Sequence, residues 1–208
     1  MSGTCCSSEI CDVTASKGFR KALWVALVVN ASMFLIEVIG GERAGSVSLW
    51  ADALDFAGDS ANYAISLAVL AMGLGWRARA ALLKGVSMVI FGGFVLAKSG
   101  WSIYQGIPPE TMVMTIIGFM ALTANVVVAL ILYAYRSGDA NMRSVWLCSR
   151  NDAIGNIAVI IAAVGVSLTS SELPDVIVAI IMASLAIHSG WAVIKQALAE
   201  LRSLRKPS

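Results

Sequence analysis

Six long runs of hydrophobic residues make up most of the chain, and short polar segments separate them. A transmembrane helix needs about 20 mostly apolar residues, and each run reaches that length. The predicted spans are Ala22–Gly41, Ser46–Met72, Ala80–Ile103, Thr111–Tyr135, Met142–Leu168 and Pro174–Leu198. The connecting segments are too short to hold a soluble domain. The pattern therefore predicts an all-α membrane protein with a bundle of six transmembrane helices.

The same pattern divides the chain into three parts. Residues 1–19 form a cysteine-containing tail, residues 20–200 form the six-helix transmembrane domain, and residues 201–208 form a short second tail. The first 16 residues contain no apolar run ahead of a small-residue cleavage site, so no cleavable signal peptide is expected. The first span is therefore predicted to be retained in the membrane.

Composition agrees with this assignment. Of the 208 residues, 58% are hydrophobic and only 13% are charged, whereas about a quarter are charged in a typical soluble protein. The net charge of +2 comes from basic residues that flank the apolar runs and do not form a patch. A nucleic-acid partner is therefore not expected.

Lysine and arginine are concentrated on one side of the predicted bundle. That side holds Lys17, Arg20, Lys21, Arg77, Arg79, Lys84, Arg136, Arg143, Arg202, Arg205 and Lys206. The other side holds Arg43 among Glu42, Glu110, Glu172 and Asp175. Because basic loops remain in the cytoplasm, both termini are predicted to be cytoplasmic.

The second span carries acids that a membrane helix normally excludes. Asp52, Asp55, Asp59 and Asn62 are spaced three, four and three residues apart, which places them on one face of a helix. Each charge near the bilayer centre costs about 2.5–3.5 kcal/mol. Protons, a basic partner or a metal ion must therefore offset the repulsion along this face.

The fifth span carries a second polar face. Cys148, Asp152 and Asn156 follow one another at four-residue intervals. At 1.5 Å per residue, Asp152 lies about 15 Å from the cytoplasmic end of its span and Asp59 roughly 20 Å from the outer end of its own. The two acids are thus expected at similar depths. Two carboxylates from one helix, with a thiolate and a carboxylate from another, suit Zn²⁺, and the sulfur favours softer ions such as Cd²⁺.

A structural role is the alternative for each buried acid, because an acid within a span often pairs with a lysine or arginine. Asp52 lies nearer the outer end, and Lys98 in the third span lies at a similar depth. We therefore expect Asp52–Lys98, or Glu37–Lys98, to form a structural ion pair. Asp55, Asp59, Cys148 and Asp152 are then left as the candidate metal ligands.

Several polar residues outside this set have more ordinary interpretations. His188, the single histidine, is expected to be a hydrogen-bonded residue of the sixth span, and Arg150 is not assigned a role. Asn30 and Asn125 are expected to form hydrogen bonds between helices, with lining of an access path as the alternative. Gly92, Gly93 and Gly100 are expected to permit close helix approach, for which a dimer interface is one place. In the tail, Cys5, Cys6 and Cys11 either capture a soft metal or belong to a disordered segment.

The segments that carry these ligands resemble the cation diffusion facilitator family. ADALDFAGD matches the family's second-span motif, in which Asp or His is followed after three residues by Asp. CSRNDAIGNIAVIIAAVG matches the fifth-span motif, which usually begins with His, three residues and Asp. The resemblance extends from about Arg20 to Arg202. It implies that Asp55, Asp59 and Asp152 are three site ligands and that Cys148 stands where the family usually has histidine.

The resemblance also implies a function. Such proteins export Zn²⁺ or similar ions from the cytosol in exchange for protons, without a prosthetic group, and usually as homodimers. A bacterial inner membrane is the expected location. The family's C-terminal cytoplasmic domain is expected to be absent here, so that dimerisation would fall to the transmembrane helices. Cys148 in place of histidine shifts the expected substrate toward thiophilic ions such as Cd²⁺.

Two other functions account for part of the pattern. Membrane phosphatidyltransferases place an Asp-x-x-Asp-Gly motif in a span, and Asp52 and Asp55 have that spacing. Phe56 stands where the glycine would be, and the second acid pair is missing at the expected distance. A non-transporting metal sensor is the other alternative. The sequence therefore favours a transporter over an enzyme.

Overall fold

The structure is a computed structural model that describes residues 17–68, 74–135 and 140–203. Within these ranges, the side chains of residues 17, 74, 75, 77, 140–151 and 203 lie outside the description. The described residues form six helices: α1 (Lys17–Ala44), α2 (Val47–Ala68), α3 (Leu74–Gln105), α4 (Thr111–Tyr133), α5 (Ala140–Thr169) and α6 (Leu173–Ser203). The predicted all-α, six-helix architecture is confirmed. α2 is described as far as Ala68, the last described residue before position 74, and every other helix has about the predicted length or is longer.

Five helices have the length and composition of membrane spans. They contain the apolar segments Gly18–Ala44, Ala78–Gln105, Thr111–Tyr133, Asp152–Thr169 and Leu173–Arg202. α2 is the exception, because its 22 residues include Asp52, Asp55 and Asp59. At 1.5 Å per residue α2 is still about 33 Å long, enough to cross the hydrocarbon core. Its acids, rather than its length, set it apart.

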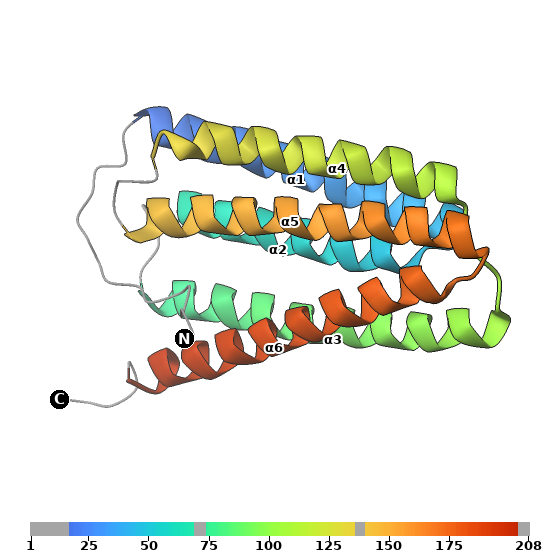
Figure 1. The fold of residues 1–208 in the computed structure, drawn as a ribbon. Helices are drawn as coiled ribbons and strands as arrows, with labels where there is room; N and C mark the ends of the chain where they lie inside the picture. Colours follow the sequence, from blue (N-terminus) through green and yellow to red (C-terminus); the bar gives the residue numbers. More distant parts are fainter. Residues whose placement is uncertain (1–16, 69–73, 136–139, 204–208) are drawn as a thin grey trace.

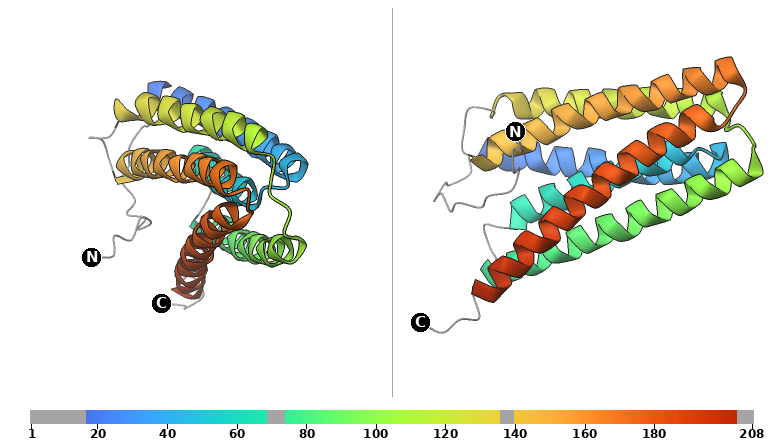
Figure 2. Two further views of the ribbon diagram at one scale, coloured as in Figure 1. Left: turned by 45° about the vertical axis from the view of Figure 1, so that its right-hand side comes forward. Right: turned by 60° about the horizontal axis from the view of Figure 1, so that its bottom comes forward.

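The closest helix contacts join α3 to α6, α1 to α2 and α4 to α5, and α1 also lies beside α4 and α2 beside α5 (Figures 1 and 2). The α2–α5 pair lies in the middle, where α2 contacts α1, α3 and α6 as well as α5. Because of this position, ten residues of α2 are buried, including Asp52 and Asp59. The two helices with the candidate ligands therefore lie at the centre of the bundle.

The two ends of the bundle differ in charge. α1 begins and α6 ends at the same end (Figure 1), which we call the basic end. The described basic residues towards it are Arg20, Lys21, Arg79, Lys195 and Arg202. The opposite end, called the acidic end, carries Glu42, Glu110, Glu172 and Asp175. At the acidic end, Gly45 and Gly106 close turns with φ of +66° and +62°, a conformation that glycine adopts without strain.

α3 and α6 cross at small residues. A Cβ atom added to Gly85 would lie 2.9 Å from the Gly190 carbonyl oxygen, and one added to Gly92 would lie 2.6 Å from the Ile187 side chain. Gly93 and Gly100 face open space. Close helix approach is thus confirmed at Gly92, where the neighbour is α6 of the same chain. Gly93 and Gly100 have no such neighbour among the described residues, and their place at a dimer interface stays a prediction.

The apolar core is unequal along the bundle. At the acidic end one cluster joins all six helices, with members such as Ala44, Leu49, Val95, Met114, Val159 and Ala179. Towards the basic end, the described buried cluster joins only α1, α2 and α4, around Leu23, Tyr63 and Val128. Apolar packing therefore seals the central helices at the acidic end more fully than the described packing does at the basic end.

Candidate functional site

Asp59 on α2 and Asp152 on α5 meet in the centre of the bundle. Their carboxyl groups lie within hydrogen-bonding reach of each other. Asp59 is buried, and the Tyr63 hydroxyl donates a hydrogen bond of 2.9 Å to its Oδ2. One carboxylate oxygen of Asp152 is buried without a hydrogen-bond partner among the described residues. Two acids from separate helices thus face each other, Asp59 buried and Asp152 partly buried.

Asp55 lies close enough to Asp59 and Asp152 for their negative charges to repel. The described side chains nevertheless include no group of three acid, cysteine or histidine residues placed to hold a metal ion. Cys148 belongs to α5, but its side chain lies outside the described set, as do those of Arg143 and Arg150. The structure therefore brings Asp59 and Asp152 together and places Asp55 nearby, and it does not describe the fourth proposed ligand.

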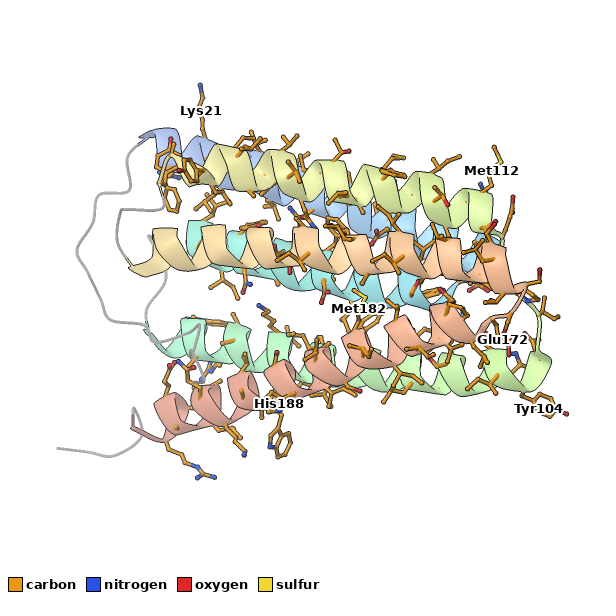
Figure 3. The ribbon with its side chains drawn as sticks, in the orientation of Figure 1. Lys21, Tyr104, Met112, Glu172, Met182 and His188 are labelled. Carbon is orange, nitrogen blue, oxygen red and sulfur yellow. The ribbon has the colours of Figure 1, made fainter. Side chains whose placement is uncertain are left out.

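The tail cysteines Cys5, Cys6 and Cys11 also lie outside the described residues. His188 is exposed on α6 (Figure 3), away from the acids of α2 and α5. Asn30 forms its described hydrogen bond within α1, to the carbonyl oxygen of Ala26 at 2.8 Å. The interhelical bond expected for Asn30 is therefore not the one that the structure shows.

Asp52 belongs to a hydrogen-bonded chain that crosses three helices. The Asn156 amide nitrogen lies 2.8 and 2.7 Å from the two carboxylate oxygens of Asp52. The Asn156 carbonyl oxygen in turn accepts a bond of 2.9 Å from the Asn125 amide. All three residues are buried. The expected interhelical role of Asn125 is confirmed, and Asn156 proves to be the partner of Asp52.

Lys98 does not pair with Asp52, so this expectation is wrong. The Lys98 ammonium lies 2.5 Å from a carboxylate oxygen of Glu42, in the last turn of α1, and 4.5 Å from the ring centre of Trp50. The long lysine side chain extends toward the acidic end, where its charge is near water. Asp52 instead faces α5 and the Asn156 amide. Equal depth in the bilayer did not mean that the two helices presented these residues to each other.

Glu37 is a buried acid that the sequence reasoning considered only as a partner for Lys98. It is fully buried in α1, and neither carboxyl oxygen has a hydrogen-bond donor among the described residues. Its carboxyl group lies within hydrogen-bonding reach of Asp52. Burying an isolated carboxylate is costly, so Glu37 adds to the acidic character of the bundle centre.

Lys84 on α3 lies near the buried acids, although the sequence analysis assigned it to the basic, cytoplasmic side of the bundle. Its ammonium group donates a hydrogen bond to the Asn62 side-chain carbonyl on α2. It also lies close enough to Asp59 to attract its negative charge. The sequence treated Lys84 as an orientation signal, although it lies inside the predicted third span. The position of Lys84 inside that span was the feature of the sequence that could have indicated a buried partner for its charge.

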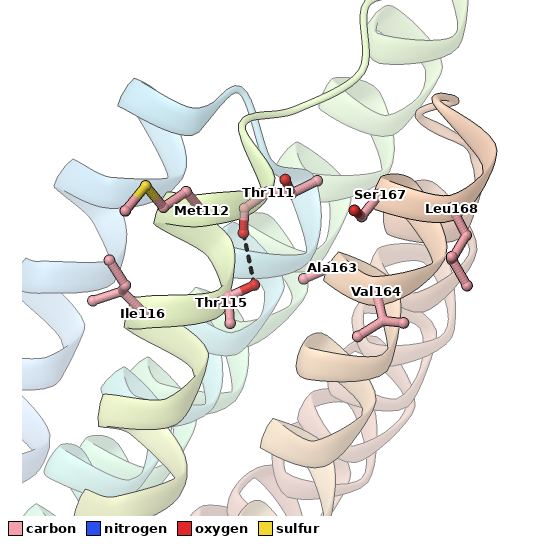
Figure 4. A pocket seen from close by; sticks show the side chains of 8 residues that line it. All are labelled: Thr111, Met112, Thr115, Ile116, Ala163, Val164, Ser167 and Leu168. Carbon is pink, nitrogen blue, oxygen red and sulfur yellow. Dashed lines mark hydrogen bonds between the residues drawn. The ribbon is translucent and has the colours of Figure 1, made fainter.

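A shallow groove of about 350 Å³ lies at the acidic end between α4 and α5 (Figure 4). It is lined by Thr111, Met112, Thr115, Ile116, Ala163, Val164, Ser167 and Leu168. The Thr115 hydroxyl donates to the Thr111 carbonyl oxygen at 2.7 Å, so that even this polar group is satisfied within its helix. No acid lines the groove, so it is separate from the Asp59–Asp152 pair.

Comparisons with known proteins agree with this arrangement. The family model for the cation efflux transmembrane domain matches residues 23–202. The zinc transporter ZitB of Pectobacterium atrosepticum is 27% identical over 197 residues, covering 88% of this chain and 62% of that protein. A cadmium, cobalt and zinc/H(+)-K(+) antiporter of Bacillus velezensis is 26% identical over 86% of this chain. The metal cation efflux system protein CzcD of Cupriavidus metallidurans is 23% identical over 87%.

The family match covers nearly the whole chain, from residue 23 to residue 202. The chain spans about 62% of the length of these relatives. The match covers all six helices, including α2 and α5 with their acids. Members of this family are transporters, so the resemblance to phosphatidyltransferases loses its support. The chain belongs to the cation efflux family.

Proposed function

We propose that this protein moves a divalent transition metal ion, Zn²⁺ or Cd²⁺, out of the cytosol in exchange for protons. The observation that carries the proposal is the meeting of the buried Asp59 and the partly buried Asp152, from the two central helices, within hydrogen-bonding reach. Facing carboxylates repel each other unless a cation or a proton lies between them. Such a pair of carboxylates is suited to exchange a bound metal ion for a bound proton.

The ligand set proposed for the ion is Asp55, Asp59, Cys148 and Asp152. Carboxylate and thiolate ligands suit a tetrahedral Zn²⁺ ion, and the thiolate strengthens the binding of Cd²⁺. The names of the relatives support both ions, since they include a zinc transporter and a cadmium, cobalt and zinc antiporter. Asp55 and the facing pair would supply three of the four donors.

Proton exchange follows from the chemistry of these ligands. A carboxyl or thiol group must lose its proton before it binds a metal ion, so metal and protons compete for the same atoms. A carrier that binds the ion on one side and protons on the other needs no further coupling device. The name of the Bacillus velezensis relative, a cadmium, cobalt and zinc/H(+)-K(+) antiporter, is compatible with this exchange.

The direction of transport is proposed from charge and packing. The basic end is assigned to the cytoplasm by the positive-inside rule, which places both termini there. The apolar cluster that joins all six helices lies at the opposite end. The arrangement therefore favours entry of the ion from the cytoplasmic side. The homodimer and the bacterial inner membrane implied by the family resemblance stay predictions.

Reconstitution into liposomes tests the function directly. With a pH-sensitive dye inside the vesicles, Zn²⁺ and Cd²⁺ are expected to enter while protons leave, and Fe²⁺ and Mn²⁺ to enter more slowly. Protein-free vesicles provide the control. Binding of Zn²⁺ without flux would indicate a sensor, and flux without a change in internal pH would refute proton exchange while leaving metal transport intact.

The sulfur ligand makes a separate prediction. Cys148→His is expected to lower the ratio of Cd²⁺ to Zn²⁺ uptake roughly tenfold, equivalent to about 1.4 kcal/mol. Imidazole is a harder ligand than thiolate and therefore favours the softer Cd²⁺ ion less. The ratio is measured in the same vesicles with both ions at equal concentration. Cys148→Ser is the matched control, since it also removes the sulfur but supplies a poor ligand for both ions. An unchanged ratio in Cys148→His would remove Cys148 from the ligand set.

A further inference from the structure

Lys84 is the described lysine that reaches the acidic centre of the bundle. Its ammonium group donates a hydrogen bond to the side chain of Asn62, which lies three residues after Asp59 on the same face of α2. The same ammonium acts electrostatically on Asp59. Lys98, by comparison, is paired with Glu42 at the acidic end, and Lys21 is exposed at the basic end (Figure 3).

The position of Lys84 along the bundle determines which charge an incoming metal ion meets first. α2 runs from the acidic end to the basic end, so Asn62 lies about 4.5 Å nearer the basic end than Asp59. The ammonium group therefore lies on the side from which the proposed function brings the metal ion. A cation that approaches Asp59 from there meets another positive charge before it reaches the carboxylates.

We propose that Lys84 is a built-in counter-ion of the transport site, whose positive charge weakens the binding of the metal ion to Asp59 and Asp152. This inference rests on the proposed function. In the metal-free protein the ammonium group balances part of the acidic charge of α2 and α5. A bound dication repels it, so that the site holds the ion less tightly and releases it more readily. Lys84 thus sets the affinity without being a ligand.

Metal binding to the purified full-length chain tests the proposal. In isothermal titration with Zn²⁺, Lys84→Met is expected to lower the dissociation constant roughly tenfold, which corresponds to about 1.4 kcal/mol. Lys84→Arg keeps the charge and is expected to stay within about twofold of the unmodified chain, on the same scale. Lys21→Met removes an exposed lysine at the basic end and serves as the matched control, with no expected change.

Lys84→Gln separates the charge from the hydrogen bond. Its amide can still donate to Asn62, but it carries no charge, so it is expected to bind Zn²⁺ as tightly as Lys84→Met. If Lys84 only ties α3 to α2, Lys84→Gln would resemble the unmodified chain and Lys84→Met would bind more weakly. That result, or unchanged binding in both variants, would overturn the proposal.

Failure of the proposed function has a different signature. An unmodified chain that binds neither Zn²⁺ nor Cd²⁺ would remove the metal site and the role of Lys84 together. An unmodified chain that binds Zn²⁺ while Lys84→Met and Lys84→Gln bind it equally well would remove the role of Lys84 alone.

Discussion

Replacing Asp59 or Asp152 with asparagine is expected to abolish metal uptake, lowering the initial rate in liposomes by at least about 100-fold, equivalent to roughly 2.7 kcal/mol. Asparagine keeps the shape of the side chain and can still accept the hydrogen bond that Tyr63 donates to Asp59. It lacks the negative charge with which a carboxylate binds Zn²⁺. Uptake of Zn²⁺ by Asp59→Asn and Asp152→Asn proteoliposomes measures the effect.

The same substitutions should not unfold the protein, because they remove a repulsion. The two carboxyl groups lie within hydrogen-bonding reach, and an amide at one position can donate to the carboxylate at the other. The melting temperature of each variant is therefore expected to equal or exceed that of the unmodified chain, as is common where a site is built for function rather than stability. Lost uptake in a stable protein distinguishes a ligand from a structural acid.

An acid away from the pair provides the control for these variants. Glu172 lies at the acidic end near the start of α6 (Figure 3) and makes a weak contact of 3.5 Å with the Ser171 hydroxyl. Glu172→Gln is expected to transport Zn²⁺ at the unmodified rate. Undiminished uptake in either Asp59→Asn or Asp152→Asn would contradict the assignment of that residue to the site.

The helices could be predicted from the sequence because a membrane span leaves a long apolar signature that few other structures share. α2 tests this argument, because Asp52, Asp55 and Asp59 interrupt its apolar sequence and it is the described helix without a candidate membrane span. Its spacing of three and four residues still indicated one polar face, and the fold places two of these residues, Asp52 and Asp59, in buried positions. Helical periodicity therefore fixed which residues share a face.

The partners of those residues could not be predicted in the same way. Depth along the bilayer suggested Lys98 for Asp52, but α5 rather than α3 supplies the partner, through Asn156. Conversely, Lys84 was used to orient the chain although its ammonium contacts Asn62. Depth depends on position in the sequence, whereas facing depends on the rotation of two helices about their axes. The packing of all six helices determines that rotation.

Replacing Asp175 with alanine is expected to destabilise the bundle by about 3–5 kcal/mol, because it leaves several buried hydrogen-bond donors unsatisfied at a cost of about 1–3 kcal/mol each. Asp175 lies in the first turn of α6 and is fully buried. Its carboxylate accepts hydrogen bonds from the Val47 and Ser48 backbone amides at 2.7 and 3.1 Å, and from the Ser46 and Ser48 hydroxyls at 2.7 and 2.5 Å. These four bonds join α6 to the start of α2.

The position of these bonds explains why their loss should be costly. The first amides of a helix have no acceptor within it, and their partial positive charge favours a carboxylate. Ser46 caps the next amide, Leu49, at 3.2 Å, so Asp175 and Ser46 together satisfy the start of α2. Without the carboxylate, the Val47 and Ser48 amides would remain buried without a described acceptor.

Thermal unfolding in detergent measures this loss. For a chain of this size, Asp175→Ala is expected to lower the melting temperature by about 10 °C, at roughly 2–4 °C per kcal/mol. The melting temperature of Asp175→Asn should lie between those of Asp175→Ala and the unmodified chain. Its amide oxygen can accept some of the hydrogen bonds, whereas its amide nitrogen faces other donors. Glu172→Ala, three residues earlier and outside the network, should change the melting temperature little. If Asp175→Ala melted with the unmodified chain, the network would not hold α6 to α2, and apolar packing among the six helices would account for the closed acidic end.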